Sequence, residues 1–201
     1  ATAKRYLPAA ELSKLKSSTA SNPQCEYARK LFLFSYYCYG ISFIDMAMLT
    51  AAHIKQMEDG DYIVYKRQKI KRQKGVKPIS IKITPAIRQL IGSLQAASPT
   101  VDDFLLPIVT RSGYTGERLY MHIRTRYSKY QKYLRLLAEE LGIDFHLTSY
   151  VSRHTAAMTL QRNNIPREVI SQMLGHADLE TTNIYLDSFD NRVINEAAKV
   201  L

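Results

Sequence analysis

Three residues near the carboxyl end have side chains that could together carry out phosphoryl transfer. Arg153 is followed by His176, which comes directly after Gly175, and Tyr185 lies nine residues beyond His176. Arginine offers a planar fork of donors to a phosphate, histidine can donate to a non-bridging oxygen, and a tyrosine hydroxyl is a nucleophile. The set predicts attack on a phosphodiester by Tyr185, with Arg153 and His176 stabilising the negative charge that develops.

Each of these residues also has an ordinary structural interpretation. The chain contains 14 tyrosines, so any single one usually belongs to the core or its rim. Arg153 could cap a helix or pair with Glu168, and His176 could bond a loop carbonyl. Tyr150 lies three residues before Arg153 and shares a helix face with it, so Tyr150 joins the candidate set. The combination of residues, rather than any one of them, indicates catalysis.

A run of positive charge indicates what the chain binds. The net charge is +10, and residues 62–82 contain no acidic residue. Such a run favours nucleic acid, because lysine and arginine neutralise phosphates and release counterions. We expect these residues, with His154 from a later segment, to contact DNA: Lys66, Arg67, Lys71, Arg72, Lys74 and Lys77.

Other classes of protein are disfavoured. The sequence has no apolar run long enough to cross a bilayer and no secretory signal is visible, so no membrane partner is expected. Cys25 and Cys38 predict free thiols rather than a disulfide or a zinc site. The five histidines form no convincing ligand set with Cys, Asp or Glu, so we expect no metal and no cofactor.

The elements that hold these residues are mostly helices. Asn22-Pro23 and Thr84-Pro85 each combine a cap with a proline that suits a first helical turn. Helices are expected at about 8–12, 24–39, 43–49, 85–94, 120–141, 148–163, 166–174, 179–186 and from 191. Residues 62–65 and 79–83 predict two antiparallel strands joined by the basic run. The fold class is therefore mainly α with a small antiparallel β-sheet (α+β), in one domain over residues 1–201.

Two segments resemble a known family. Residues 174–185, Leu-Gly-His-Ala-Asp-Leu-Glu-Thr-Thr-Asn-Ile-Tyr, resemble the C-terminal signature of the tyrosine recombinases, or phage integrase family. Residues 152–155, Ser-Arg-His-Thr, resemble its second-arginine box, and the likeness extends from Leu7 to the last helix. The resemblance implies a tyrosine recombinase catalytic-domain fold and a site-specific recombinase (integrase). Such an enzyme cuts and rejoins DNA through a 3′-phosphotyrosyl bond, here on Tyr185, without a metal.

The resemblance also implies that a lysine of the hairpin protonates the departing 5′-oxygen. Counting back from the second strand selects Lys74, whereas counting forward along the first strand selects Lys69. Lys69 is slightly favoured, because the length of a strand changes less readily than that of a loop. Either lysine could instead be a contact to the phosphate backbone.

Two positions depart from the family pattern. Ser42 stands where the first arginine is expected, and Tyr150 stands where the second box opens with histidine. A branch of the family from conjugative and mobilisable elements looks similar. Another cation would then have to take the place of the first arginine at the phosphate. The candidates are Arg67, Arg124 and Arg126. A catalytically weakened DNA-binding protein on the same fold is the alternative, followed by a type IB topoisomerase and a basic nucleic-acid-binding domain with an accidental motif.

The resemblance further implies partners and a setting. The expected partner is a double-stranded DNA recombination site, bound by a homotetramer that exchanges the C-terminal helix at 191–201, with DNA-bending accessory proteins. The N-terminal DNA-clamping domain of family members is not expected within these residues. The expected location is the bacterial cytoplasm, in association with the nucleoid.

Overall fold

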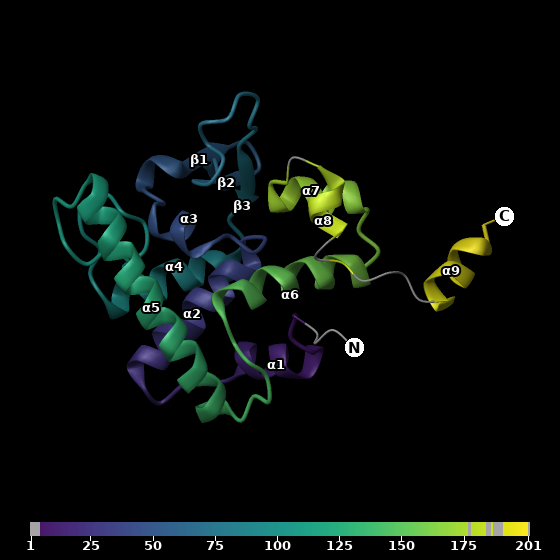
Figure 1. Ribbon diagram of the computed structural model, residues 1–201, viewed down its shortest axis with the longest axis horizontal. Coiled ribbons are helices and arrows are strands. Elements are labelled where there is room, and N and C mark those ends of the chain that lie inside the picture. The colour runs from purple at the N-terminus through teal and green to yellow at the C-terminus, as the bar shows by residue number, and fades with distance from the viewer. Residues whose placement is uncertain (1–4, 177, 184–185, 187–190, 201) are drawn as a thin grey trace.

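The computed structural model describes residues 5–176, 178–183, 186 and 191–200. It is mainly helical around one small sheet, which confirms the predicted fold class (Figure 1). The elements are α1 Ala9–Ser17, α2 Pro23–Tyr37, α3 Phe43–Ala47, a 3-10 turn Ala51–His53, β1 Ile54–Met57, β2 Gly60–Tyr65, β3 Ile79–Lys82, α4 Pro85–Ala97, α5 Gly116–Leu141, α6 Ser149–Arg162, α7 Arg167–Leu174, α8 Leu179–Asn183 and α9 Asn191–Ala198.

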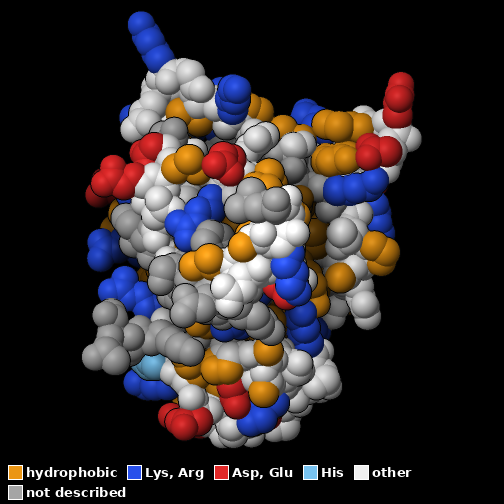
Figure 2. All heavy atoms as spheres, turned by 90° about the vertical axis from the view of Figure 1, so that its right-hand side faces the viewer, with side chains coloured by type: hydrophobic (Ala, Val, Ile, Leu, Met, Phe, Trp, Pro, Cys, Tyr) orange, Lys and Arg blue, Asp and Glu red, His pale blue; other side chains and the backbone are white. Residues whose placement is uncertain are grey.

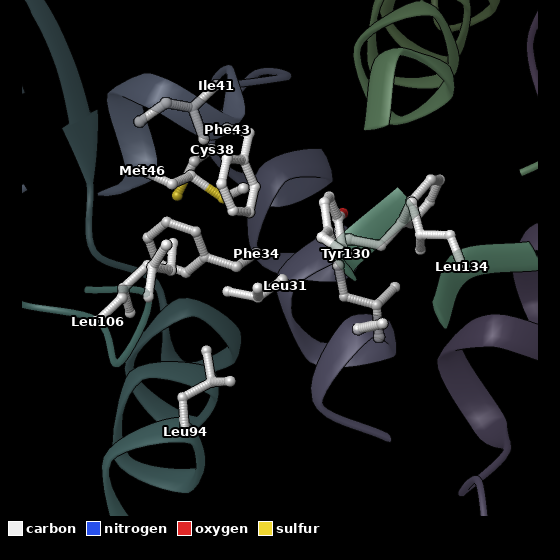
Figure 3. Packing of buried hydrophobic residues seen from close by; sticks show 14 of the residues in the cluster. Leu31, Phe34, Cys38, Ile41, Phe43, Met46, Leu94, Leu106, Tyr130 and Leu134 are labelled. Atoms are coloured by element: carbon white, nitrogen blue, oxygen red, sulfur yellow. The ribbon is translucent and has the colours of Figure 1, made fainter. Parts of the chain in front are cut away.

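Helix α2 is the centre of the main core. It begins as predicted, because the Asn22 side chain accepts hydrogen bonds from the first free backbone N–H groups and Pro23 opens the helix. Its apolar residues point in several directions, and α2 packs against α4, α5 and α6. Figure 3 shows Leu31 and Phe34 between the side chains of α4 and α5, where Tyr130 contributes from α5. This core fixes the helices that carry the candidate site.

The sheet has three antiparallel strands in the order β1-β2-β3. The two predicted strands are present as β2 and β3, with Tyr65 paired to Ile79 and the basic run between them at residues 66–78. Strand β1 was not predicted, because Ile54–Met57 is mostly exposed and has no run of strand-forming residues. Figure 1 places the connection between β2 and β3 at the top of the molecule, where Figure 2 shows projecting Lys and Arg side chains.

The start of one long helix was predicted wrongly. Helix α5 begins at Gly116 rather than near Tyr120, directly after Thr115. Glycine has a low helix propensity, so residues 111–116 gave the pattern of a loop. The described part of α8 is Leu179–Asn183, and the rest of the predicted helix, up to residue 186, includes residues outside the described part of the chain.

A second, smaller cluster lies beneath α7 and α8. Its buried members come from the N-terminal segment, α6, α7 and the residue after Tyr185, and they are Tyr6, Ala157, Met158, Ile170, Leu174 and Leu186. The N-terminal segment is also fixed by polar contacts, because the Leu7 N–H donates to Thr155 Oγ1 at 3.0 Å. The guanidinium of Arg162 lies 5.0 Å from the centre of the Tyr6 ring. We call the six buried residues Tyr6, Ala157, Met158, Ile170, Leu174 and Leu186 the small cluster.

Helix α9 stands apart from the rest of the molecule in Figure 1. Its described side chains are exposed, and Ile194 is 54% exposed. Within the described part of the chain, no helix combines the length and the apolar character needed to cross a membrane.

Candidate active site

Arg153 is buried at the junction of three segments. It lies on α6, is 4% exposed, and donates from Nη1 to the Gly40 carbonyl at 3.1 Å and from Nη2 to the Leu174 carbonyl at 2.6 Å. Nη2 also lies 2.8 Å from His176 Nε2. The end of α2 and the turn after α7 therefore fix the direction of this guanidinium. Arg153 and His176, proposed from sequence as a pair, are in direct contact.

The contact with Arg153 determines the tautomer of His176. A guanidinium has donors and no acceptor, so Nε2 must accept the bond and the ring proton must lie on Nδ1. Nδ1 lies 2.8 Å from Thr182 Oγ1 and donates to it. His176 therefore connects Arg153 on α6 to Thr182 on α8.

The electrostatic environment keeps His176 neutral. Burial, and then the charges of Arg153 and Arg67, lower the pKa of His176 to about 4, while Asp178 opposes the shift. At neutral pH the ring is an acceptor towards Arg153. A phosphate anion at the same place would oppose the arginine charges and raise the pKa of His176, because an opposite charge favours the imidazolium. The site can thus change His176 from an acceptor into a donor when an anion binds.

Two glycines permit the close packing around this pair. Gly40 has a φ of +70°, and a Cβ there would lie 2.5 Å from the Cα of Arg153. Gly175 has a φ of +65°, and its Cβ would lie 2.5 Å from Ile79 Cδ1 on β3. Both positions lie in the left-handed region, which glycine enters without steric cost. The carbonyl bound by Arg153 and the turn that presents His176 each depend on a residue without a side chain.

A cavity of about 350 Å³ opens beside Arg153. Most of its wall is apolar, and its polar or charged lining residues include Ser42, Arg67, Arg124, Tyr150 and Arg153. The cavity thus brings together residues of α3, α5, α6 and the hairpin. Its three arginines could contact a phosphate, while the apolar part of the wall could pack against an attached sugar.

Ser42 faces this cavity, but its hydroxyl is engaged in the fold. Its Oγ caps α3 by accepting from the backbone N–H of Asp45, and it donates to Asp45 Oδ2 at 2.6 Å. The other carboxylate oxygen of Asp45 accepts from the backbone N–H of Gln68 at 2.7 Å. Asp45 is 4% exposed. These contacts join the position of the missing first arginine to the start of the basic connection between β2 and β3.

The three candidate replacement cations lie in different surroundings. Arg67 and Arg124 both line the cavity. Arg126 instead donates to the Ile108 carbonyl at 3.1 Å and lies 5.8 Å from the centre of the Tyr27 ring. Arg67 Nη1 donates to the Gly175 carbonyl at 3.3 Å, and its charge contributes to the low pKa of His176. Of the three, Arg67 approaches the Arg153–His176 pair most directly.

Tyr150 and His154 are neighbours on α6 with different exposure. Tyr150 is 55% exposed on the wall of the cavity, with its ring centre 5.2 Å from that of His154. His154 is only 4% exposed, and burial followed by the charges of Arg5 and Arg153 lowers its pKa to about 4. His154 lies one turn from Tyr150 and has little accessible surface, and a contact of its ring with DNA stays a prediction.

The basic residues of the hairpin are displayed on the surface. Lys69 and Lys74 are both exposed in the connection between β2 and β3, so exposure does not distinguish them as proton donors. The other exposed basic residues of the predicted DNA-contacting set in this connection are Lys66, Lys71, Arg72 and Lys77. Lys66, Lys71 and Arg72 also line a second hollow of about 570 Å³.

Tyr185 lies outside the described residues. The chain on either side of it is well anchored: Arg167 Nη1 donates to Asn183 Oδ1 at 2.6 Å, and Leu186 is 9% exposed in the small cluster. Asp178 Oδ1 accepts from the Thr181 N–H at 2.7 Å at the start of α8. Among the residues that the structure describes, no group of three or more His, Cys, Asp or Glu is placed to hold a metal ion.

Sequence reasoning gave no role to two residues that the geometry makes prominent. Thr182 is fully buried against His176, and the only signal was its place within the Thr-Thr pair of the recognised signature. Asp45 accepts from both the Ser42 hydroxyl and the backbone N–H of Gln68. The Asp45–Gln68 contact joins segments 23 residues apart, and the Thr182–His176 contact depends on the turn between α7 and α8, so neither follows from the period of a single helix.

Residues 5–192 match the sequence profile of the phage integrase family. Over 119 residues, 58% of this chain, the sequence is 30% identical to the tyrosine recombinase XerD of Brucella abortus biovar 1, of which the match covers 35%. A shorter stretch of 54 residues, 27% of this chain, is 43% identical to XerD of Halalkalibacterium halodurans and covers 18% of it. These matches span about a third of the length of the curated relatives or less.

Solved structures show the same fold. The crystal structure of XerA recombinase superimposes with a TM-score of 0.64 at 22% identity, over 96% of this chain and 64% of that protein. A fragment of the Tn1549 transposon integrase (R225K variant) in complex with a circular intermediate DNA superimposes with a TM-score of 0.66 at 13% identity, over 100% of this chain and 67% of that chain.

Proposed function

The chain belongs to the phage integrase family, and from this membership we propose that it is the catalytic domain of a site-specific tyrosine recombinase that cuts and rejoins DNA through Tyr185. The observation that carries the proposal is the contact between Arg153 and His176 at the edge of a cationic cavity. The recognised signature places Tyr185 nine residues after His176.

In the proposed reaction the Tyr185 oxygen attacks a phosphorus of the DNA backbone. The new bond is a 3′-phosphotyrosyl ester, and the bond from phosphorus to the 5′-oxygen breaks. Lys69, or alternatively Lys74, gives a proton to the departing 5′-oxygen. A 5′-hydroxyl of another strand then attacks the same phosphorus and releases Tyr185, so the phosphodiester is restored without ATP.

The described residues would stabilise the charge that develops on the phosphate. Arg153 is held in place by the Gly40 and Leu174 carbonyls and therefore needs little reorganisation. His176 is neutral in the free protein because burial and the arginine charges lower its pKa to about 4. Binding of the phosphate would raise that pKa and allow Nε2–H to donate to a non-bridging oxygen.

We assign the role of the missing first arginine to Arg67. The Ser42 side chain ends in a hydroxyl that donates to Asp45, so it cannot supply positive charge. Arg67 lines the same cavity as Arg153 and contacts the turn that presents His176. Arg124 also lines the cavity, but its charge is not among the causes of the low His176 pKa. Tyr150, exposed at the cavity, would donate a hydrogen bond to the phosphate.

The proposed partner is double-stranded DNA at a recombination site. The exposed basic connection at 66–78 would lie against the phosphate backbone, since it carries positive charge without any acidic residue. The proposed assembly is a homotetramer that exchanges α9, which stands apart from the molecule and exposes Ile194 (Figure 1). Accessory proteins that bend the DNA would complete this assembly.

The test is covalent trapping with the full-length protein. DNA selected for binding to that protein is prepared with a nick near the cleavage position, so that the released fragment diffuses away and the covalent product accumulates. We expect an adduct that survives SDS, a phosphotyrosine at residue 185 by mass spectrometry, and loss of the adduct in Tyr185→Phe. The matched control is Tyr133→Phe, a half-buried tyrosine on α5 that should leave the adduct unchanged.

The second candidate function is DNA binding without cleavage, favoured by the engagement of Ser42 with Asp45. It predicts tight binding to the selected DNA and no adduct with either the parent or the Tyr185→Phe protein. That outcome would overturn the proposed recombinase activity.

A further inference from the structure

We propose that Thr182 is a positioning residue whose hydroxyl sets the orientation and the proton of His176 and joins this histidine to the helix that precedes Tyr185. The inference rests on the proposed function and deepens it. Thr182 has no accessible surface, and its Oγ1 lies 2.8 Å from His176 Nδ1.

The chemistry of the two neighbours determines the direction of each hydrogen bond. Arg153 can only donate, so it holds His176 Nε2 as an acceptor and leaves the proton on Nδ1. The Nδ1–H group of His176 therefore donates to Thr182 Oγ1. The nitrogen that carries the proton in a histidine is set by the partner of the other nitrogen, so Arg153 and Thr182 together specify one tautomer.

A hydroxyl has a property that a carbonyl or a carboxylate lacks at this position. It can accept from Nδ1–H and, after rotation, donate to a bare Nδ1. When a phosphate replaces Arg153 as the neighbour of Nε2, His176 needs a proton on Nε2, either as the imidazolium or as the other tautomer. Thr182 keeps the ring in place in both cases, because one side chain satisfies Nδ1 in either state.

The position of Thr182 also couples the histidine to the nucleophile's segment. Thr182 lies three residues before Tyr185 in the sequence, on a helix tied to α7 by the bond between Arg167 and Asn183. A displacement of α8 would therefore move the partner of His176 as well. We infer that His176 is correctly oriented only when α8 is in place, which restricts its assistance to the arrangement in which Tyr185 can attack.

A purely structural role makes a different prediction. If Thr182 only fills space, a residue of the same shape without a hydroxyl should serve equally well. Thr182→Val keeps the shape and removes the hydrogen bond, whereas Thr182→Ser keeps the hydroxyl and removes a methyl group. The matched control is Thr181→Val, because the neighbouring Thr181 supports the start of α8 through Asp178. Loss of the Thr181 hydroxyl therefore weakens the same helix without touching His176.

The experiment uses the full-length protein labelled with ¹⁵N-histidine, and the His176 signals are identified by their absence in His176→Asn. In the free parent protein and in Thr182→Ser we expect a protected Nδ1–H proton on His176. In Thr182→Val this proton should exchange too fast to be observed. The rate of Tyr185 adduct formation should fall about tenfold in Thr182→Val, the effect of one lost hydrogen bond. It should change less than threefold in Thr182→Ser and Thr181→Val, with unchanged DNA binding in all variants.

Two results would overturn the inference. One is a Thr182→Val protein that retains the protected Nδ1–H and the parental rate, and the other is a Thr182→Ser protein as impaired as Thr182→Val. If Thr182→Val does not fold, Thr182→Ala takes its place with the same expectations. A parent protein that forms no adduct would refute the proposed function alone, since the histidine spectrum of the free protein still decides whether Thr182 holds Nδ1.

Discussion

Gly40 is the position where the smallest change should have the largest effect on the site. In Gly40→Ala, the new methyl group would meet the Cα, Cβ and Cγ of Arg153 at 2.5–2.7 Å. The first of these atoms is backbone, so it cannot turn aside as the end of a side chain could. The φ of +70° adds conformational strain, which for an alanine is about 1–2 kcal/mol.

The expected cost combines this strain with the overlap. Forcing an extra methyl group into a packed interior typically costs about 1–3 kcal/mol. We therefore expect Gly40→Ala to lower the free energy of unfolding by roughly 2–5 kcal/mol. Small domains have total stabilities of about 5–15 kcal/mol, so a large part of the stability would be lost. The substitution would also move the Gly40 carbonyl away from Arg153 Nη1, which donates to this carbonyl at 3.1 Å in the parent protein.

The assay is urea unfolding of this chain followed by far-ultraviolet circular dichroism. The matched control is Gly92→Ala on α4, where an added Cβ meets no atom within 4 Å. Because alanine is the better helix former, Gly92→Ala should raise stability by about 0.5–1 kcal/mol. A Gly40→Ala protein that unfolds at the same urea concentration as the parent would refute the argument that Arg153 and Gly40 pack this closely.

The site should also respond to pH, to cation removal and to the choice of leaving group. The depressed pKa of His154 and His176, about 4 against 6.5 when unfolded, means that the unfolded chain binds more protons. Stability should therefore be full above pH 6.5 and fall as pH drops towards 4, and NMR titration midpoints near 6.5 for these rings would contradict this. Arg67→Met should slow adduct formation by about 10²–10³-fold, as for loss of an oxyanion donor, and equal losses in a matched Arg124→Met protein would argue against the assignment. Lys69→Ala should slow cleavage by about 10²–10⁴-fold and be rescued by a 5′-bridging sulfur, which leaves without a proton. Rescue of Lys74→Ala instead would identify that lysine as the acid.

Local signals in the sequence were sufficient to predict most of the helices. Caps followed by proline located the starts of α2 and α4. Each of these signals acts within four residues, so the chain itself carries the information. Strand β1 was not predicted, because its formation depends on pairing with β2, with Ile54 opposite Ile63, rather than on its own residue types.

The arrangement of the candidate site could be predicted only in part. Spacing and residue type singled out Arg153 and His176, and the structure places them in contact. The burial of His154 was not predicted, because the sequence of α6 does not show which of its faces lies against the N-terminal segment. The choice of Arg67 over Arg126 likewise required the fold, since Arg126 turns towards the Ile108 carbonyl on another side of α5.

The division of the interior into a large core and a small cluster has a consequence for how the molecule opens. Among the residues that the structure describes, the small cluster has six buried side chains, whereas the main core extends through α2, α4 and α5. A region with few apolar contacts opens at a lower free energy than the global transition. On gentle heating, α7 and α8 should therefore melt first, while α2 remains folded. Amide hydrogen exchange should then be faster at Ile170 and Leu174 than at Phe32 and Phe34, so the segment leading to Tyr185 would behave as a separate cooperative unit.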